Sequence, residues 1–452
     1  MGFSFDISQS GLLAARRGIN VAQNNIANAN TDGYARERLE LAPNTTNSGA
    51  TIDGQIGSGV VTKEVVRLVD ELMLQQSRHE MGQTDYFSSM RQHLSNLESV
   101  FSETKEGSVS ALLSQFYYAY EELAKYPEQH SYRLSLVGQA ERLAEKFNSI
   151  QEKMSQMRSE VDQTIEVKRN KINELVDKIA NVNDRIGKTG GGNANALMDE
   201  RDRYINELSV YGGVVVEQSA EGKGIVNVRF GEALLVSGTR GNRLEMMEMN
   251  DGEIVLHTGS VTARVEGGSL AADLDFRNRS LPQYNDTLNL LVGDVIANVN
   301  GIHATGYGLD NTTGEPFFLG GNAGSIAVNT VLKQAPEKVA TSSVAGAEGN
   351  NDIARQIASL RTSPTLNGGT TSPVAFYDGF SIQMASDLHI AKDNEKVHEA
   401  ILLNVNEQKE AVQGVNTDEE MTNLMMFQQY YQANAKAISI IKESLDALMR
   451  MI

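Results

Sequence analysis

The feature that most constrains the fold is a pair of heptad stripes, one near each end of the chain. Near the N-terminus, residues recur at alternating spacings of three and four: Phe5, Ser8, Leu12, Ala15, Ile19, Ala22 and Ile26. Near the C-terminus the same spacing runs through Leu424, Phe427, Tyr431, Asn434, Ile438, Ile441, Leu445, Leu448 and Ile452. This period aligns all members of a set along one narrow face of an α-helix. We therefore predict a helix at each end that needs a partner along its stripe.

The two terminal helices are expected to be marginal in isolation. Gly11 and Gly18 each weaken an isolated helix by about 1 kcal/mol relative to alanine. The segment 28–34 is rich in Asn, also contains Asp32 and Gly33, and predicts the end of the N-terminal helix. Asn434, a polar residue inside the C-terminal stripe, is typical of positions that determine register. The helices can pair with each other, with neighbouring copies, or with both, and we expect them to become ordered on assembly.

The middle of the chain predicts further helices. One apolar heptad run extends over 131–186 without an internal proline or, after Gly138, glycine, which predicts a rod of roughly 80 Å. The run shifts by four residues between Val161 and Ile165, a stutter that locally unwinds a supercoil. Segments 64–100 and 108–126 are predicted as helices packed alongside. Helical spacing returns over 270–303 and 382–412.

From residue 211 to residue 266 the pattern changes to short β-type runs separated by Gly, Asn and Asp. The predicted fold class is therefore mainly α: a terminal-helix coiled-coil domain and a long-helix bundle domain, with a small inserted all-β domain. The predicted domains are 1–40 with 412–452, 41–210 with 267–411, and 211–266.

The composition excludes several classes of function. The 452 residues include no cysteine, so disulfides, thiolate metal sites and a cysteine nucleophile are excluded. The formal net charge of −18 argues against binding to nucleic acid or anionic membranes. No apolar run approaches the roughly 18 residues of a membrane span. The first residues show no secretory signal peptide.

No arrangement of residues predicts catalysis. The seven histidines are scattered and none belongs to an HExxH motif. The charged run 199–203 is typical of a solvated helix face. We predict no enzymatic activity, no metal and no cofactor.

Several segments along the chain carry a resemblance to a known family. Residues 24–36, which include Asn25, Asn28, Asn30, Thr31, Gly33 and Tyr34, resemble the N-terminal motif of bacterial flagellar rod, hook and hook-associated proteins. Residues 415–420 and 427–435 resemble the C-terminal signature of the same axial family. Segments 197–203 and 267–277, with 300–307 and 316–318, narrow the resemblance to the proteins of the hook–filament junction.

The resemblance implies a structural protein of the extracellular flagellum. Such proteins are exported through the flagellar type III apparatus without a cleaved signal peptide and assemble as a ring of subunits. The implied partners are further copies of the chain, the hook protein, the second hook-associated junction protein and an export chaperone on the C-terminal helix; nucleic acid and membrane insertion are not implied. The candidate assembly interface comprises the stripe residues from Leu12 to Ile26 and from Leu424 to Leu448.

Two alternatives remain open. Another axial protein, either hook protein or the second junction protein, shares the terminal motifs, but the internal segments favour the first junction protein. A non-flagellar coiled-coil surface protein accounts for rods and acidity, yet is expected to carry a signal peptide.

Overall fold

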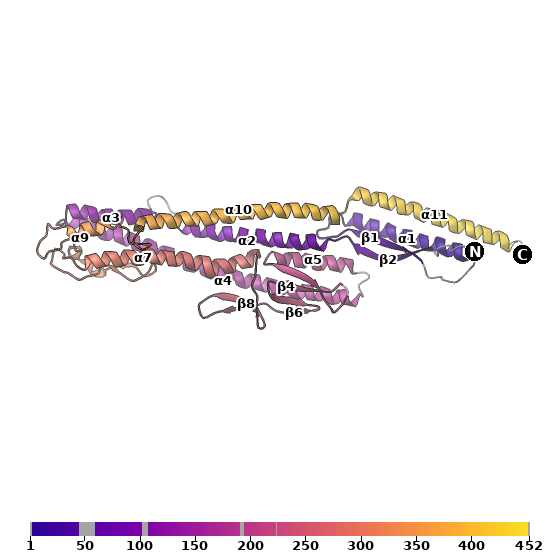
Figure 1. The fold of residues 1–452 in the computed structure, drawn as a ribbon, viewed down its shortest axis with the longest axis horizontal. Coiled ribbons are helices and arrows are strands. Elements are labelled where there is room, and N and C mark those ends of the chain that lie inside the picture. Colours follow the sequence, from indigo (N-terminus) through magenta and orange to yellow (C-terminus); the bar gives the residue numbers. More distant parts are fainter. Residues whose placement is uncertain (1, 45–58, 102–106, 190–193, 223, 451–452) are drawn as a thin grey trace.

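The computed structural model describes residues 2–44, 59–101, 107–189, 194–222 and 224–450. Within them the chain is strongly elongated, and its two ends lie together at one end of the molecule (Figure 1). Ile452, the last residue of the predicted C-terminal stripe, lies outside the described residues. The predicted fold class is confirmed, since long helices dominate and small antiparallel sheets occupy the middle of the chain.

The helices account for most of the length. They are α1 (Gly2–Ala27), α2 (Glu71–Phe101), α3 (Val109–Lys125), α4 (His130–Lys188), α5 (Asn195–Ser209), α6 (Gly268–Asp275), α7 (Leu281–His303), α8 (Thr330–Gln334), α9 (Asp352–Ser359), α10 (Pro373–Gln413) and α11 (Thr417–Met449), with the π-helical turn η1 (Phe276–Ser280) and the 3-10 turn η2 (Pro336–Lys338). No helix among the described residues is both long and apolar enough to span a membrane.

All sheets are small and antiparallel. A hairpin joins β1 (Glu37–Pro43) to β2 (Val60–Arg67), and β10 (Phe318–Leu319) pairs with β11 (Ala327–Val328). The other strands form two sheets, of order β3-β4-β5-β6 and β7-β8-β9: β3 (Val214–Gln218), β4 (Val226–Phe230), β5 (Ala233–Ser237), β6 (Arg240–Gly241), β7 (Glu245–Glu248), β8 (Ile254–Thr258) and β9 (Val261–Thr262).

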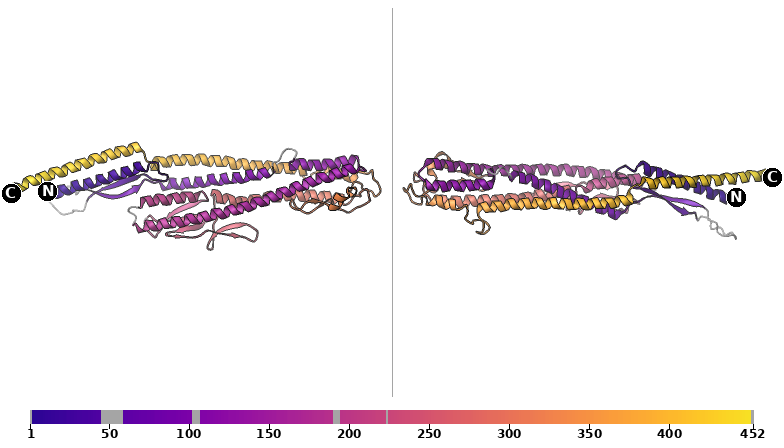
Figure 2. Two further views of the ribbon diagram at one scale, coloured as in Figure 1. Left: turned by 180° about the vertical axis from the view of Figure 1, so that it is seen from behind. Right: turned by 90° about the horizontal axis from the view of Figure 1, so that it is seen from above.

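The helical body is built along α4, whose apolar stripe is buried as predicted. The apolar residues at heptad spacing along α4 are buried, except Met157, which is partly buried. The stripe continues past the stutter through the buried Val161, Ile165 and Ile172. Helix α10 runs along α2 on the other side of the body, as both views in Figure 2 show. The long helices therefore share one apolar core from α3 to the β insertion.

The predicted helix over 64–100 is wrong at its start. Residues 64–67 belong to β2, and α2 begins only at Glu71. Strand β2 is rich in β-branched residues that pair with β1, which favours an extended backbone. The side chain of Asp70 then accepts hydrogen bonds from the amides of Leu72 and Met73, at 2.9 and 3.1 Å, and so caps the helix.

The π-helical turn η1 attaches the β insertion to the body. Phe276 is buried and stacks on His93, with ring centroids 4.7 Å apart. Asn278 accepts a hydrogen bond from the Ile254 amide at 3.0 Å and donates one to the Ile254 carbonyl at 2.9 Å. Arg277 reaches Asp162 on α4 at 2.8 Å. The extra residue of a π turn thus aims neighbouring side chains at the core and at the insertion.

A buried aromatic cluster closes the end of the molecule farthest from the termini. Phe116 and Tyr120 of α3 meet Phe317 and Phe318, and the last two rings are 4.9 Å apart. His303, at the end of α7, lies edge-on to Phe317 and is 1% exposed. Its Nε2 accepts the Ala340 amide at 2.9 Å, so its Nδ1 carries the proton and donates to the Glu315 carbonyl at 2.7 Å.

His303 is expected to destabilise the fold on acidification. Burial lowers its pKa from 6.5 to about 4, so between these pH values the unfolded chain binds a proton that the folded chain rejects. The contribution of the neutral His303 to the free energy of unfolding is fully present above pH 6.5. About 3 kcal/mol of it is lost as the pH drops to 4. Urea unfolding across this range, with the His303 ring followed by NMR, measures both quantities. A ring that titrates near 6.5 in the folded protein contradicts the expectation.

Candidate assembly interface

The terminal helices α1 and α11 pack against each other in antiparallel fashion (Figure 1). A Cβ atom at Gly11 would lie 2.6 Å from Oδ1 of Asn434, and one at Gly18 would lie 2.6 Å from a ring carbon of Phe427. One heptad further along, Asn25 Nδ2 is 3.1 Å from Glu420 Oε2. These contacts step by seven residues along each helix in opposite directions, so a single register is repeated over the pair.

The face that α1 turns toward α11 differs from the predicted stripe. It comprises small and polar residues at the same alternating spacing: Ser8, Gly11, Ala15, Gly18, Ala22 and Asn25. Ser8, Ala15 and Ala22 belong to both sets, whereas Leu12, Ile19 and Ile26 lie at its edge and are half-buried, and Phe5 is exposed. The contact face is therefore displaced by part of a helical turn from the predicted stripe. Small residues occupy it because they permit a closer approach of the two helices than leucine or isoleucine.

On α11 the predicted stripe does face α1, but it is only partly covered. Leu424, Phe427, Asn434, Ile438 and Ile441 are half-buried, whereas Tyr431, Leu445 and Leu448 are exposed. Among the described residues of α11, only Glu420 is buried. One chain therefore leaves much of this helix without cover.

A buried asparagine connects the motif segment to both terminal helices. Asn25 is fully buried; its Nδ2 donates to the Glu37 carbonyl at 2.9 Å and to Glu420, and its Oδ1 accepts from Tyr34 Oη at 2.8 Å and from the Glu37 amide at 3.0 Å. Burial, reinforced by Glu37, raises the pKa of Tyr34, which keeps its hydroxyl a donor. Arg36 Nη2 contacts Glu420 at 2.7 Å.

Replacing Asn25 with alanine is expected to loosen this attachment. Glu37 and Glu420 would lose their partner inside a buried site, at a cost of about 1–3 kcal/mol. In the assembled state, where the terminal helices are expected to be ordered, we expect the amides of β1 to exchange about ten- to a hundredfold faster with deuterium. Asn24→Ala is the matched control, since the Asn24 side chain is exposed and its contacts to Tyr34 and Glu37 are longer, at 3.2 Å each. Equal effects of the two substitutions would contradict the role given to Asn25.

The remaining motif residues shape the exit from α1. Asn28 Nδ2 donates to the Asn24 carbonyl at 3.0 Å, and the Asn28 side chain accepts from Thr31 Oγ1 at 3.2 Å. Gly33 has φ of 77°, a conformation that favours glycine. Asn30 and Thr31 line a cavity described below. The structure therefore brings together Asn25 and Tyr34 directly, while the other motif residues form the turn between them.

The prediction that residues 199–203 form a solvated face is wrong for its central members. Asp202, with a side chain only 13% exposed, lies 2.7 Å from Arg67, 3.4 Å from Arg78 and 3.6 Å from Arg201. Asp199 contacts Arg67 at 2.8 Å. This ion cluster joins β2, α2 and α5, and no local periodicity in the sequence indicates that these distant arginines converge.

The two carboxylates of the cluster respond differently to their surroundings. Burial alone would raise the pKa of Asp202, but Arg67, Arg201 and Arg78 together hold it below its usual value. Burial dominates at Asp199 and raises its pKa to about 6, against the opposing effect of Arg67. Asp202 is therefore the anion that balances the buried arginines.

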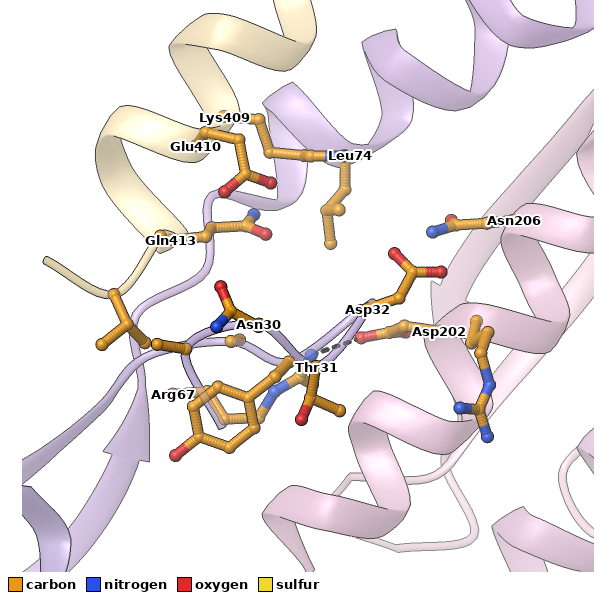
Figure 3. Close-up of a pocket in the computed structure, with 17 residues that line it drawn as sticks. Asn30, Thr31, Asp32, Arg67, Leu74, Asp202, Asn206, Lys409, Glu410 and Gln413 are labelled. Atoms are coloured by element: carbon orange, nitrogen blue, oxygen red, sulfur yellow. Dashed lines mark hydrogen bonds and ion pairs between the residues drawn. The ribbon is translucent and has the colours of Figure 1, made fainter. Parts of the chain in front are cut away.

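A cavity of about 370 Å³ lies beside the ion cluster. Figure 3 shows Lys409, Glu410 and Gln413 from the end of α10 on one side, and Asn30, Thr31 and Asp32 from the motif segment on the other; Asp202 and Asn206 of α5 close it. The cavity thus sits where the terminal helices meet the body. No cluster of three or more His, Asp or Glu residues suited to a metal ion occurs in the part of the chain that the structure describes.

Sequence reasoning missed the two glycines as contact residues. It treated Gly11 and Gly18 only as helix-weakening, although their spacing of seven, extended to Asn25, was a visible signal. The hairpin and its arginine at position 67 had no comparable signal, because their partners lie far along the chain.

Comparisons with known proteins match three parts of the chain to family models. Residues 94–318 match the flagellar hook-associated protein FlgK helical domain. Residues 5–34 match the flagella basal body rod protein model, and residues 411–451 match the flagellar basal body rod FlgEFG protein C-terminal model.

Full-length relatives agree with these matches. The flagellar hook-associated protein 1 of Bacillus subtilis is 25% identical, with 97% of each chain covered, and that of Escherichia coli is 24% identical, with 98% of each covered. The solved structure of the flagellar hook junction protein FlgK from Burkholderia pseudomallei superposes with a TM-score of 0.65 at 13% identity, covering 75% of this chain and all of that one. That structural likeness concerns the fold.

Proposed function

The chain belongs to the family of flagellar hook-associated protein 1, a family of structural flagellar proteins, and we propose that it forms the junction between hook and filament by ring assembly through α1 and α11. The observation that carries this proposal is the incomplete cover of α11. Only one residue of the described helix is buried within the chain, while apolar residues along its length are exposed. Exposed apolar surface of this kind marks a site at which another molecule binds.

The proposal includes the order of events. The chain is exported through the type III apparatus to the extracellular flagellum, with a chaperone covering the C-terminal helix until assembly. It then binds further copies of itself, the hook protein and the second junction protein. The small-residue contact between α1 and α11 buries little apolar area, so the pair is expected to gain most of its order in the ring.

The three-domain division is part of the same proposal. Its support is that β3 to β9 all lie within 211–266, and that α1 pairs with α11 from the opposite end of the sequence. Each of the two helical domains would then be built from both halves of the chain.

Electron microscopy of hooks incubated with the purified protein tests the function. We expect a ring at the distal hook end, absent when residues 424–452 are deleted, while secretion and folding of the body persist. Unchanged filament attachment by the truncated chain would contradict the proposal. Hydrogen exchange tests the order of events, since strong protection of residues 5–30 and 424–452 in the free protein is incompatible with ordering on assembly.

A further inference from the structure

Helix α11 carries a second heptad face beside the one that contacts α1. Each member immediately precedes a member of the first stripe, which places it about 100° around the helix: Asn423, Met426, Tyr430, Ala433, Ala437, Ile440, Ser444 and Ala447. We call this set the outer face. Its large side chains are open to solvent, with Met426 37%, Tyr430 52% and Ile440 55% exposed.

Helix α1 carries a complementary row of large apolar residues. Phe5, Leu12, Ile19 and Ile26 follow one another at intervals of seven, and we call them the α1 row. Phe5 is 39% exposed and the other three are half-buried at the edge of the contact with α11. The row and the outer face extend over similar lengths of helix.

The hairpin β1–β2 shows that these two surfaces lie on opposite sides of the helix pair. On α1 the hairpin contacts Ser10, whose Oγ accepts the Val60 amide at 3.1 Å; Leu12, two residues later, points about 200° away from it. On α11 the corresponding side holds Glu419, which precedes Met426 by one heptad and contacts Arg36, the residue directly before β1, at 2.9 Å. The outer face therefore borders the hairpin side, and the α1 row faces away from it.

We propose that the α1 row of one copy packs on the outer face of α11 in the next copy. The inference rests on the proposed ring assembly and specifies its lateral contact. The four large side chains of the row act as knobs, and the outer face offers holes where Ala433 and Ala437 separate Tyr430 from Ile440. Two different surfaces on opposite sides make a heterologous contact, which repeats from copy to copy and forms a ring when the rotation between copies closes.

The absence of native cysteine allows a direct cross-linking test. One variant carries Ile19→Cys or Leu12→Cys, a second carries Ala433→Cys or Ser444→Cys, and equal amounts are assembled on hooks and oxidised with copper phenanthroline. We expect disulfide-linked dimers in the mixed assemblies at least tenfold above those in either variant alone, because a disulfide needs Cα atoms within about 7 Å. Gln432→Cys, adjacent to Ala433 but on another face, is the control for random collision.

The outcomes separate this inference from the proposed function. If rings form on hooks but Gln432→Cys cross-links as well as Ala433→Cys, or each variant cross-links mainly with itself, the heterologous contact is wrong while ring assembly stands. If no rings form with the unmodified chain, the proposed function itself fails.

A charge substitution provides a second measurement. Ala433→Arg is expected to lower incorporation into hook-bound rings at least tenfold, whereas Gln432→Arg leaves it within twofold. Equal incorporation of both variants would overturn the assignment of the outer face.

Discussion

A chain carrying Gly18→Leu is expected to be exported and to fold in its body, but to join hooks at least fivefold less efficiently. Even a Cβ atom at this position would lie 2.6 Å from the ring of Phe427, so a leucine forces α11 away from α1 or displaces the ring. Overpacking of this kind costs about 1–3 kcal/mol, which corresponds to roughly five- to a hundred-and-fiftyfold in an equilibrium constant. Quantifying hook-bound protein against secreted protein measures the effect.

Two further variants show whether the close approach itself is responsible. Gly138→Ala in α4 is the matched control, because a Cβ atom there meets nothing within 4 Å and the change is expected to be neutral or stabilising. Adding Phe427→Ala to the Gly18→Leu chain is expected to restore part of the incorporation. A Gly18→Leu chain that assembles normally would show that α1 and α11 need not pack closely in the proposed ring.

Asp202→Asn is expected to cost about 3–5 kcal/mol of the free energy of unfolding of the body. Asp202 is the carboxylate shared by Arg67, Arg78 and Arg201, all of which are largely buried. Removing its charge leaves these guanidinium groups without their common anion, although the amide has the same shape. Urea unfolding followed by far-ultraviolet circular dichroism at pH 7 measures the loss.

An exposed acidic residue supplies the comparison. Asp184 contacts Lys188 at 2.5 Å one helical turn away, and both side chains are exposed. Asp184→Asn is expected to change the free energy of unfolding by less than about 0.5 kcal/mol. If Asp202→Asn had an equally small effect, the ion cluster would not hold β2, α2 and α5 together.

Local periodicity predicted most of the secondary structure. The stripe through α4 is buried almost residue for residue because one helix determines which of its own side chains share a face. The predicted start of α10 at residue 382 was too late: Ser372 caps the helix by accepting the Ala375 amide, and Pro373 occupies its first turn. The hairpin was missed because its register depends on two segments separated in sequence.

The candidate assembly surface of α1 and α11 shows the same limit of local periodicity. The sequence predicted two terminal helices with heptad stripes, since the spacing of Phe5 to Ile26 and of Leu424 to Leu448 is a local property. It did not predict that Gly11 and Gly18 would take the contact positions, because that depends on how closely α11 approaches.

The sequence by itself determined the two terminal helices, the long central helix, their stripes, the β insertion and the resemblance to flagellar axial proteins. Only the tertiary structure decided which residues of the terminal helices lie in the contact between α1 and α11. It also decided that residues 199–203 form an ion cluster with Arg67 and Arg78. The physical reason is that periodicity specifies directions around one helix. Burial and charge pairing depend on the distance to segments that the chain brings from elsewhere.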